Sequence, residues 1–172
     1  CTGSVTPATK CAAATGAVCN ISKVYDQTGN ARDFTQTTAA NQPTLAFAAI
    51  NSLPALACNG STSIIATPNI TQSQPFSTAS VWVRTTGTSS GSAVGAGSGG
   101  IITLGASAGA NNARIGGGSI VGIPGSITDG NYHYLVGSWN STSSAYNIDG
   151  TDATSQNFGT GSFSGNTFRI CS

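Results

Sequence analysis

Hydrophobic and polar positions follow a strand pattern most clearly over residues 132–139, which read YHYLVGSW. On a two-residue period, the odd-numbered residues share one face of a strand and the even-numbered residues share the other. Both faces are largely apolar, so we expect a central strand in a sheet that is covered on both sides. Turn dipeptides at 129–130 and 149–150 enclose this strand and a second predicted strand over 145–148.

The rest of the chain is a series of short β-prone runs between turns, which predicts an all-β protein. The run at 79–84 alternates, with Val81 and Val83 on one face and Trp82 on the other. Residues 85–100 are rich in Gly and Ser, and we expect a loop there. The other predicted strands are 20–25, 45–50, 56–58, 63–66, 101–104, 114–115, 120–123 and 167–171.

Two segments resemble known families. Residues 129–150, DGNYHYLVGSWNSTSSAYNIDG, are similar to the DG-x-W-H … V-D-G hairpin of laminin-G-like and concanavalin A-like jelly rolls, with Tyr132 in place of Trp. Residues 19–45, from CNISKVYDQTGNARDFTQ to NQPTL, resemble the C-x(5)-YDQSGNGNDLTQ … NQP signature of the arabinofuranosidase B-like catalytic domain. That family is itself concanavalin A-like, so the resemblance implies a two-sheet antiparallel β-sandwich of the jelly-roll type.

The resemblance also implies an unfilled position in the sheet. Residues 167–171, TFRIC, look like the L-R-I-G strand of these sandwiches, after which at least one more core strand normally follows. No further strand follows here, and an uncovered position would expose unpaired backbone groups. We therefore expect either that the chain is trimmed or that residues 1–10, from this chain or from a neighbouring copy, cover this position.

Five cysteines suggest an oxidising compartment, with buried free thiols in a cytosolic protein as the alternative. We predict an N-terminal arm over 1–19, stapled by a bridge between Cys11 and Cys19, and a sandwich domain over 20–172. In the family that the chain resembles, a similar bridge closes a shorter loop. Cys58 and Cys171 are the next candidates for a disulfide, and their pairing stays open at this point. Cys1 is then free, joined to a neighbouring chain, or lipidated.

Composition narrows the classes of function. The chain has 172 residues, enough for one domain of ordinary size. Only 6% of the residues are charged and the formal net charge is +1, which argues against nucleic-acid binding and against a basic membrane-binding patch. No apolar run reaches the roughly 18 residues of a membrane span. A single His and the absence of a C-x-x-C motif argue against zinc, and we predict no metal and no cofactor.

The acidic residues are too few for ordinary glycosidase chemistry, which needs a pair of carboxyl groups. The chain contains no Glu, and its five Asp residues leave residues 34–128 without any carboxylate. The enzymes of the family use a glutamate nucleophile in the region that corresponds to 95–115. Asp26 and Asp33 flank one tight loop, where they can pair or hold Ca²⁺ weakly, and for the Asp residues in turns we expect backbone capping. For His133 we expect a structural role.

Sugar binding would need exposed aromatic side chains, and the candidates are Tyr25 and Trp82, with Asp26 and Asp33 beside Tyr25. Core packing is the competing role for both aromatic residues. We predict a non-catalytic extracellular module, displayed on a cell surface or a virion, that is a structural or adhesive subunit, contacts copies of itself and binds glycans. The alternatives are a fragment of an arabinofuranosidase whose nucleophile lies outside the chain and a lectin-like monomer.

Overall fold

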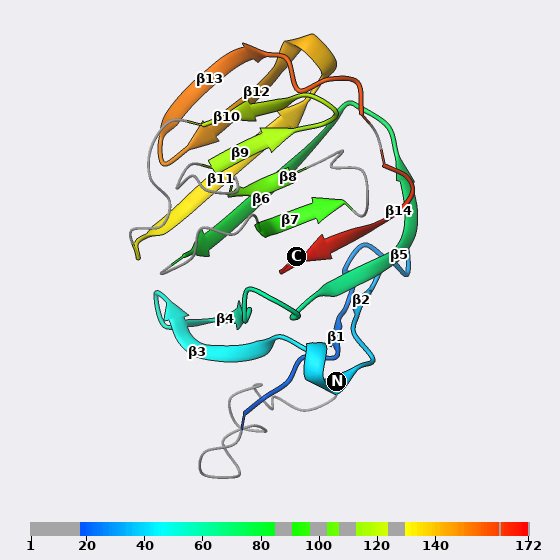
Figure 1. Cartoon of the computed structure of the whole chain (residues 1–172), viewed down its shortest axis with the longest axis vertical. Coiled ribbons are helices and arrows are strands. Elements are labelled where there is room, and N and C mark those ends of the chain that lie inside the picture. The colour runs from blue at the N-terminus through cyan, green and yellow to red at the C-terminus, as the bar shows by residue number, and fades with distance from the viewer. Residues whose placement is uncertain are drawn as a thin grey trace.

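A computed structural model describes residues 18–84, 91–96, 103–106, 113–123, 130–161 and 163–171. These residues form an all-β structure of antiparallel strands, with two short 3-10 helices, η1 at Ala39–Asn41 and η2 at Ser141–Ser143 (Figure 1). The strands are β1 Lys23–Val24, β2 Phe34–Thr35, β3 Thr44–Ile50, β4 Leu53–Ala57, β5 Ile65–Gln72, β6 Phe76–Val83, β7 Gly91–Ala96, β8 Thr103–Ala106, β9 Ala113–Gly116, β10 Ile120–Gly122, β11 Tyr132–Trp139, β12 Ser144–Ile148, β13 Thr151–Gln156 and β14 Phe163–Ile170.

The strand predicted over 132–139 is confirmed as β11, with the same bounds. It lies inside a four-stranded sheet in the order β13-β12-β11-β6, between β12 and β6. All eight residues of β11 pair with β6, from Tyr132 opposite Val83 to Trp139 opposite Phe76. The predicted strand at 145–148 is β12, which begins one residue earlier, and the turn at 149–150 connects it to β13.

The prediction that both faces of this strand are covered is wrong. The odd-numbered residues of β11 are buried and the even-numbered residues are exposed. The reason is that the second sheet packs on one face only, so that Tyr132, Tyr134 and Val136 stay outside although they are largely apolar. Val81 and Val83 of β6 lie on the same outer face, and Trp82 lies on the inner face, as their alternation predicted.

The other large sheet has eight strands in the order β1-β2-β5-β14-β7-β8-β9-β10, and the two sheets overlap face to face in a sandwich-like arrangement (Figure 1). The prediction of an unfilled position beside residues 167–171 is wrong. Strand β14 pairs with β5 on one side and with β7 on the other, so neither flank of 168–170 is open. The prediction of a loop at 85–100 is also wrong in part, because this segment contains strand β7. Strand β7 forms despite its Gly and Ser content because its backbone pairs with β14 and with β8.

The core lies between the four-stranded sheet and the end of the larger sheet that carries β9 and β10. Trp139 is fully buried, stacks on Phe76 with ring centroids 5.2 Å apart, and meets Phe158 edge-on at 5.7 Å. Its indole Nε1 donates a hydrogen bond of 3.2 Å to the carbonyl oxygen of Gly116, which satisfies the one polar atom of the ring. The other buried members of this cluster are Ile115, Ile123, Leu135 and Ile148.

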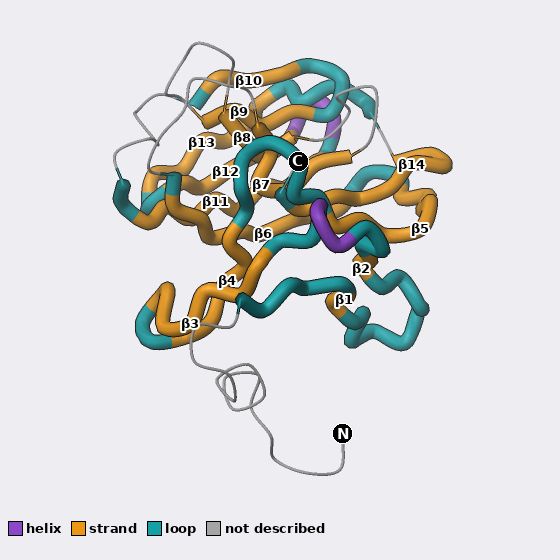
Figure 2. The backbone as a smooth tube through the Cα atoms, turned by 60° about the horizontal axis from the view of Figure 1, so that its bottom comes forward, coloured by secondary structure: helices purple, strands orange, loops and turns teal. Residues whose placement is uncertain are grey.

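A separate two-stranded sheet, formed by β3 and β4, lies at one end of the molecule (Figure 2). The Tyr132 hydroxyl donates a hydrogen bond to the carbonyl oxygen of Ala49 in β3. A disulfide between Cys58 and Cys171 links the end of β4 to the end of β14. Cys19 is also disulfide-bonded, whereas Cys11 and most of the predicted arm at 1–19 lie outside the described residues.

The two helices of the described part span three residues each, and no helix there could cross a membrane.

Candidate functional site

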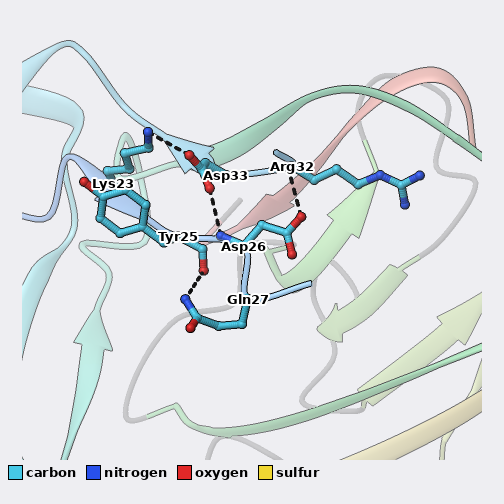
Figure 3. Close-up of polar contacts among 6 residues, drawn as sticks. All are labelled: Lys23, Tyr25, Asp26, Gln27, Arg32 and Asp33. Atoms are coloured by element: carbon cyan, nitrogen blue, oxygen red, sulfur yellow. Dashed lines mark hydrogen bonds and ion pairs between the residues drawn. The ribbon is translucent and has the colours of Figure 1, made fainter. Parts of the chain in front are cut away.

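The loop between β1 and β2 carries three of the four residues that the sequence marked for sugar binding, namely Tyr25, Asp26 and Asp33 (Figure 3). Its turn at residues 26–30 contains Asp, Gly and Asn, the residue types that favour turns. Gly29 has φ +79°, a left-handed conformation that favours glycine. The loop therefore reverses the chain between two strands that pair over Lys23–Val24 and Phe34–Thr35.

The Asp26 carboxylate accepts hydrogen bonds from other residues of this loop. Its Oδ1 accepts hydrogen bonds from the Thr28 backbone N–H at 2.8 Å and from the Thr28 hydroxyl at 2.6 Å, and its Oδ2 accepts one from the Arg32 N–H at 3.1 Å. Led by the Thr28 hydroxyl, these donors lower the pKa of Asp26 to about 2, because they stabilise the ionised form. Asp26 thus serves as an internal acceptor for its own loop.

Asp33 holds the same loop from the other side. Its Oδ1 accepts a hydrogen bond of 2.8 Å from the Asp26 backbone N–H, and its Oδ2 lies 2.7 Å from Lys23 Nζ (Figure 3). The Lys23 ammonium is the main cause that lowers the pKa of Asp33, and the same contact raises the pKa of Lys23. Asp26 and Asp33 are therefore linked through the Asp26 backbone N–H, and each carboxylate accepts from donors of its own, whereas the sequence suggested a carboxylate pair or a weak Ca²⁺ site.

Tyr25 is the exposed aromatic residue of this loop, with 65% of its surface accessible to solvent. The Lys23 ammonium lies 4.7 Å from the centroid of its ring, within the range of a cation–π contact. Gln27 also donates a side-chain hydrogen bond of 3.1 Å to the Tyr25 carbonyl oxygen. The competing prediction of core packing is therefore wrong for Tyr25. Its ring is exposed to solvent and is held in place by its contact with the Lys23 ammonium.

Trp82 is not part of this loop. It lies on β6 in the other sheet, packs against the core cluster, and has its ring centroid 6.3 Å from that of His133. The proposed group of four sugar-binding residues is thus divided, with Trp82 on the inner face of the four-stranded sheet. Alternation along 79–84 had already placed Trp82 on the other face of the strand from Val81 and Val83. It gave no sign of which of the two faces is buried.

His133 has an acidic partner that the sequence analysis did not identify. Its Nδ1 lies 2.7 Å from Asp149 Oδ2, and Asp149 Oδ1 accepts a hydrogen bond of 2.9 Å from the Tyr134 backbone N–H. Asp149 thus reaches across to β11, and the expectation that it caps only its own turn is wrong. Register could have suggested this contact, because the 149–150 turn lies beside the first residues of β11 once β11 and β12 are paired.

A histidine oriented by a carboxylate is also two-thirds of a hydrolytic triad. The hydroxyls nearest in register on the inner face of β6 belong to Thr78 and Ser80, and both oxygens are buried with no hydrogen-bond partner in the structure. A nucleophile must be reached by its substrate, and these atoms have almost no exposed surface. The His133–Asp149 pair is therefore better explained as a structural contact that ties the turn after β12 to β11.

Within the described ranges, no three His, Cys, Asp or Glu side chains come together in a way that could hold a metal ion. An open depression of about 430 Å³ lies near the Cys58–Cys171 disulfide, and its lining includes Asn20, Gln42 and Asn59. Its polar side chains are all neutral, and that of Asn59 is engaged by the N–H groups of the three residues Ser61 to Ser63.

No family model, curated protein or solved structure matches this chain.

Proposed function

We propose that this chain is a non-catalytic extracellular module that acts by contact, as a structural or adhesive subunit of a surface filament or virion appendage. The observation that carries the proposal is that the carboxylates of the chain are hydrogen-bonded within the fold. Each carboxylate that the structure describes accepts hydrogen bonds from neighbouring groups of the fold, whereas a glycosidase needs a pair that faces the scissile bond.

The Asp26 and Asp33 carboxylates support this proposal most directly, because they come closest to forming a pair. Both are ionised well below neutral pH, since their pKa values are lowered by Thr28 and Lys23 respectively. A general acid needs a raised pKa, so neither carboxyl group is suited to donate a proton to a leaving group. Asp149 and Asp152 are held by β11 and by Asn147, and Asp129 lies outside the described residues.

The disulfides support the extracellular part of the proposal. Cys58–Cys171 joins two elements far apart in the sequence, and Cys19 is bonded as well, which suits an oxidising compartment. We also infer that the sandwich is of the concanavalin A-like jelly-roll type. The support is the hairpin at 129–150 and the YDQTGN loop, the two segments whose sequence resembles that family.

Glycan contact is proposed at Tyr25. An exposed aromatic ring next to amide and ammonium donors is the usual surface for stacking a sugar ring. Tyr25 offers this beside Gln27 and Lys23, whereas Trp82 is withdrawn toward the core. The contact is thus expected on the loop between β1 and β2 and not on β6.

The test measures hydrolysis and glycan binding on one preparation of the protein. Hydrolysis of an aryl arabinofuranoside is expected to equal the buffer blank. Turnover that disappears in Asp26→Asn or Asp33→Asn would overturn the proposal and favour a hydrolase fragment. On a glycan array, Tyr25→Ala is expected to abolish the signal, while Phe47→Ala, which removes another exposed aromatic ring, is expected to preserve it.

A further inference from the structure

The outer face of β6 and β11 carries five large exposed apolar side chains: Val81, Val83, Tyr132, Tyr134 and Val136. Each is between 41% and 56% accessible to solvent. We call this surface the outer face. The strand register places Tyr132 opposite Val83, Tyr134 opposite Val81, and Val136 opposite Ala79, so these side chains are contiguous. Contiguous apolar patches of this kind mark interaction sites on soluble proteins.

We propose that the outer face is the contact surface for a second copy of this chain, with the two four-stranded sheets stacked face to face. The inference rests on the proposed function as a contact module and names its partner. Two sheets can stack at about 10 Å when their facing side chains are apolar and interdigitate. A two-fold axis would bring the same patch of each copy together, as in most soluble dimers.

The charge of the outer face favours a copy of itself. No described residue of β6 or β11 carries an acid, a lysine or an arginine, and Asp152, on β13 at the far edge of the sheet, is bound to Asn147 at 2.6 Å. Stacking the face on itself therefore brings no like charges together along these two strands. Interface cores are depleted of charge and enriched in Tyr, which is the composition found here.

The size of the sheet is also sufficient for a weak dimer. Strands β6 and β11 have eight residues each, β12 has five and β13 has six, so at about 3.3 Å per residue and about 4.8 Å between strands one surface of this sheet covers roughly 430 Å². Two such surfaces bury on the order of 900 Å², which lies in the range of weak, transient interfaces. We therefore expect a dissociation constant at the micromolar end of the range for protein interfaces.

The chemistry of the outer face fits other occupants less well. A sugar ring needs hydrogen-bond partners beside the aromatic ring, and the aliphatic side chains of Val81, Val83 and Val136 provide none. The Tyr132 hydroxyl already donates to the carbonyl oxygen of Ala49. An anionic lipid surface would need a basic rim. The nearest charged group of the hairpin is instead the Asp149 carboxylate, beside Tyr134.

The experiment is sedimentation equilibrium of the full chain from below to above about 10 μM. The wild type is expected to shift from 17.0 kDa toward twice that mass. Val81→Lys and Val136→Lys are each expected to weaken the dimer more than about tenfold, because an unpaired ammonium would be buried at the contact. Val81→Thr keeps the shape of the side chain and should weaken the dimer less than Val81→Lys does.

Thr71→Lys is the matched control, because Thr71 is an exposed strand residue of the other sheet. The dissociation constant of this variant's dimer should equal that of the wild type. Near-ultraviolet circular dichroism of each variant verifies that the fold is retained. A wild type that stays at 17.0 kDa throughout, or a dimer that both Lys variants leave unchanged, would refute the inference. So would a monomer that binds glycans or neutral lipid vesicles through Val81. The absence of hydrolysis would still stand in each case, so the two proposals fail separately.

Discussion

At the scale of single residues, Asp26 shows how the loop between β1 and β2 uses a carboxylate as a structural group. Three hydrogen bonds from two residues of the loop end on this side chain. Asp26 is thus the main acceptor within the loop, and Asp33 adds a second one through the Asp26 backbone N–H. The same use of the carboxylate removes it from acid–base chemistry near neutral pH.

This use of Asp26 predicts a pH dependence. Its pKa is lowered from 3.8 to about 2, so its contribution to loop stability is complete above 3.8 and is lost as the pH falls through about 2. Thr28→Val removes the hydroxyl donor and is expected to raise the pKa of Asp26 toward 3.8. Carbon-detected NMR titration of the Asp26 carboxyl group measures this shift. An unchanged pKa in Thr28→Val would mean that the Thr28 hydroxyl does not hold the carboxylate.

At the scale of elements, the contact between β11 and β9 depends on a glycine. Gly137 lies on the buried face of β11, where a Cβ atom would come within 2.5 Å of Ile115 Cδ1 and 2.7 Å of the Trp139 ring. Both neighbours are fully buried, so neither can move aside easily. The absence of a side chain at 137 thus allows the two sheets to approach each other.

Gly137→Ala is expected to lower the free energy of unfolding by about 1 to 3 kcal/mol, the usual cost of overpacking a core. Chemical denaturation measures the change. Gly122→Ala is the matched control, because Gly122 is also a strand glycine but has nothing within 4 Å of its added Cβ. Adding Ile115→Val to Gly137→Ala should recover part of the loss, and equal effects of the two glycine substitutions would contradict this explanation.

At the scale of the whole molecule, the Cys58–Cys171 disulfide joins the β3–β4 hairpin region to the central strand of the large sheet. The two cysteines are 113 residues apart in sequence, so the bond closes a long loop in the unfolded chain. Closing a long loop restricts the unfolded state more than closing a short one. The bond is thus expected to stabilise the entire sandwich and not the hairpin alone.

The double variant Cys58→Ser, Cys171→Ser is expected to lower the free energy of unfolding by about 5 kcal/mol in the chain-entropy model. Denaturation of the oxidised proteins measures this difference. Each single substitution should cost as much as the double variant, because either one breaks the bond. A double variant within about 1 kcal/mol of the wild type would show that the unfolded chain is not restrained by this bond.

The sequence by itself determined the features that depend on neighbours along the chain. Alternation over residues 132–139 predicted the bounds of β11 and the residues that share each of its faces. Turn residues predicted the reversal at 149–150, where Asp149 and Gly150 both have positive φ. These predictions hold because side-chain period and backbone conformation are local properties.

Only the tertiary structure decided which faces are covered and which strands pair. Alternation cannot tell that the even-numbered face of β11 is exposed, because that depends on where the second sheet lies. Strand β7 was missed in a Gly/Ser-rich stretch and β13 in the polar residues 151–156, since pairing with neighbouring strands overrode their weak propensity. The His133–Asp149 contact and the position of β14 between β5 and β7 likewise depend on register and on pairing between segments distant in the chain.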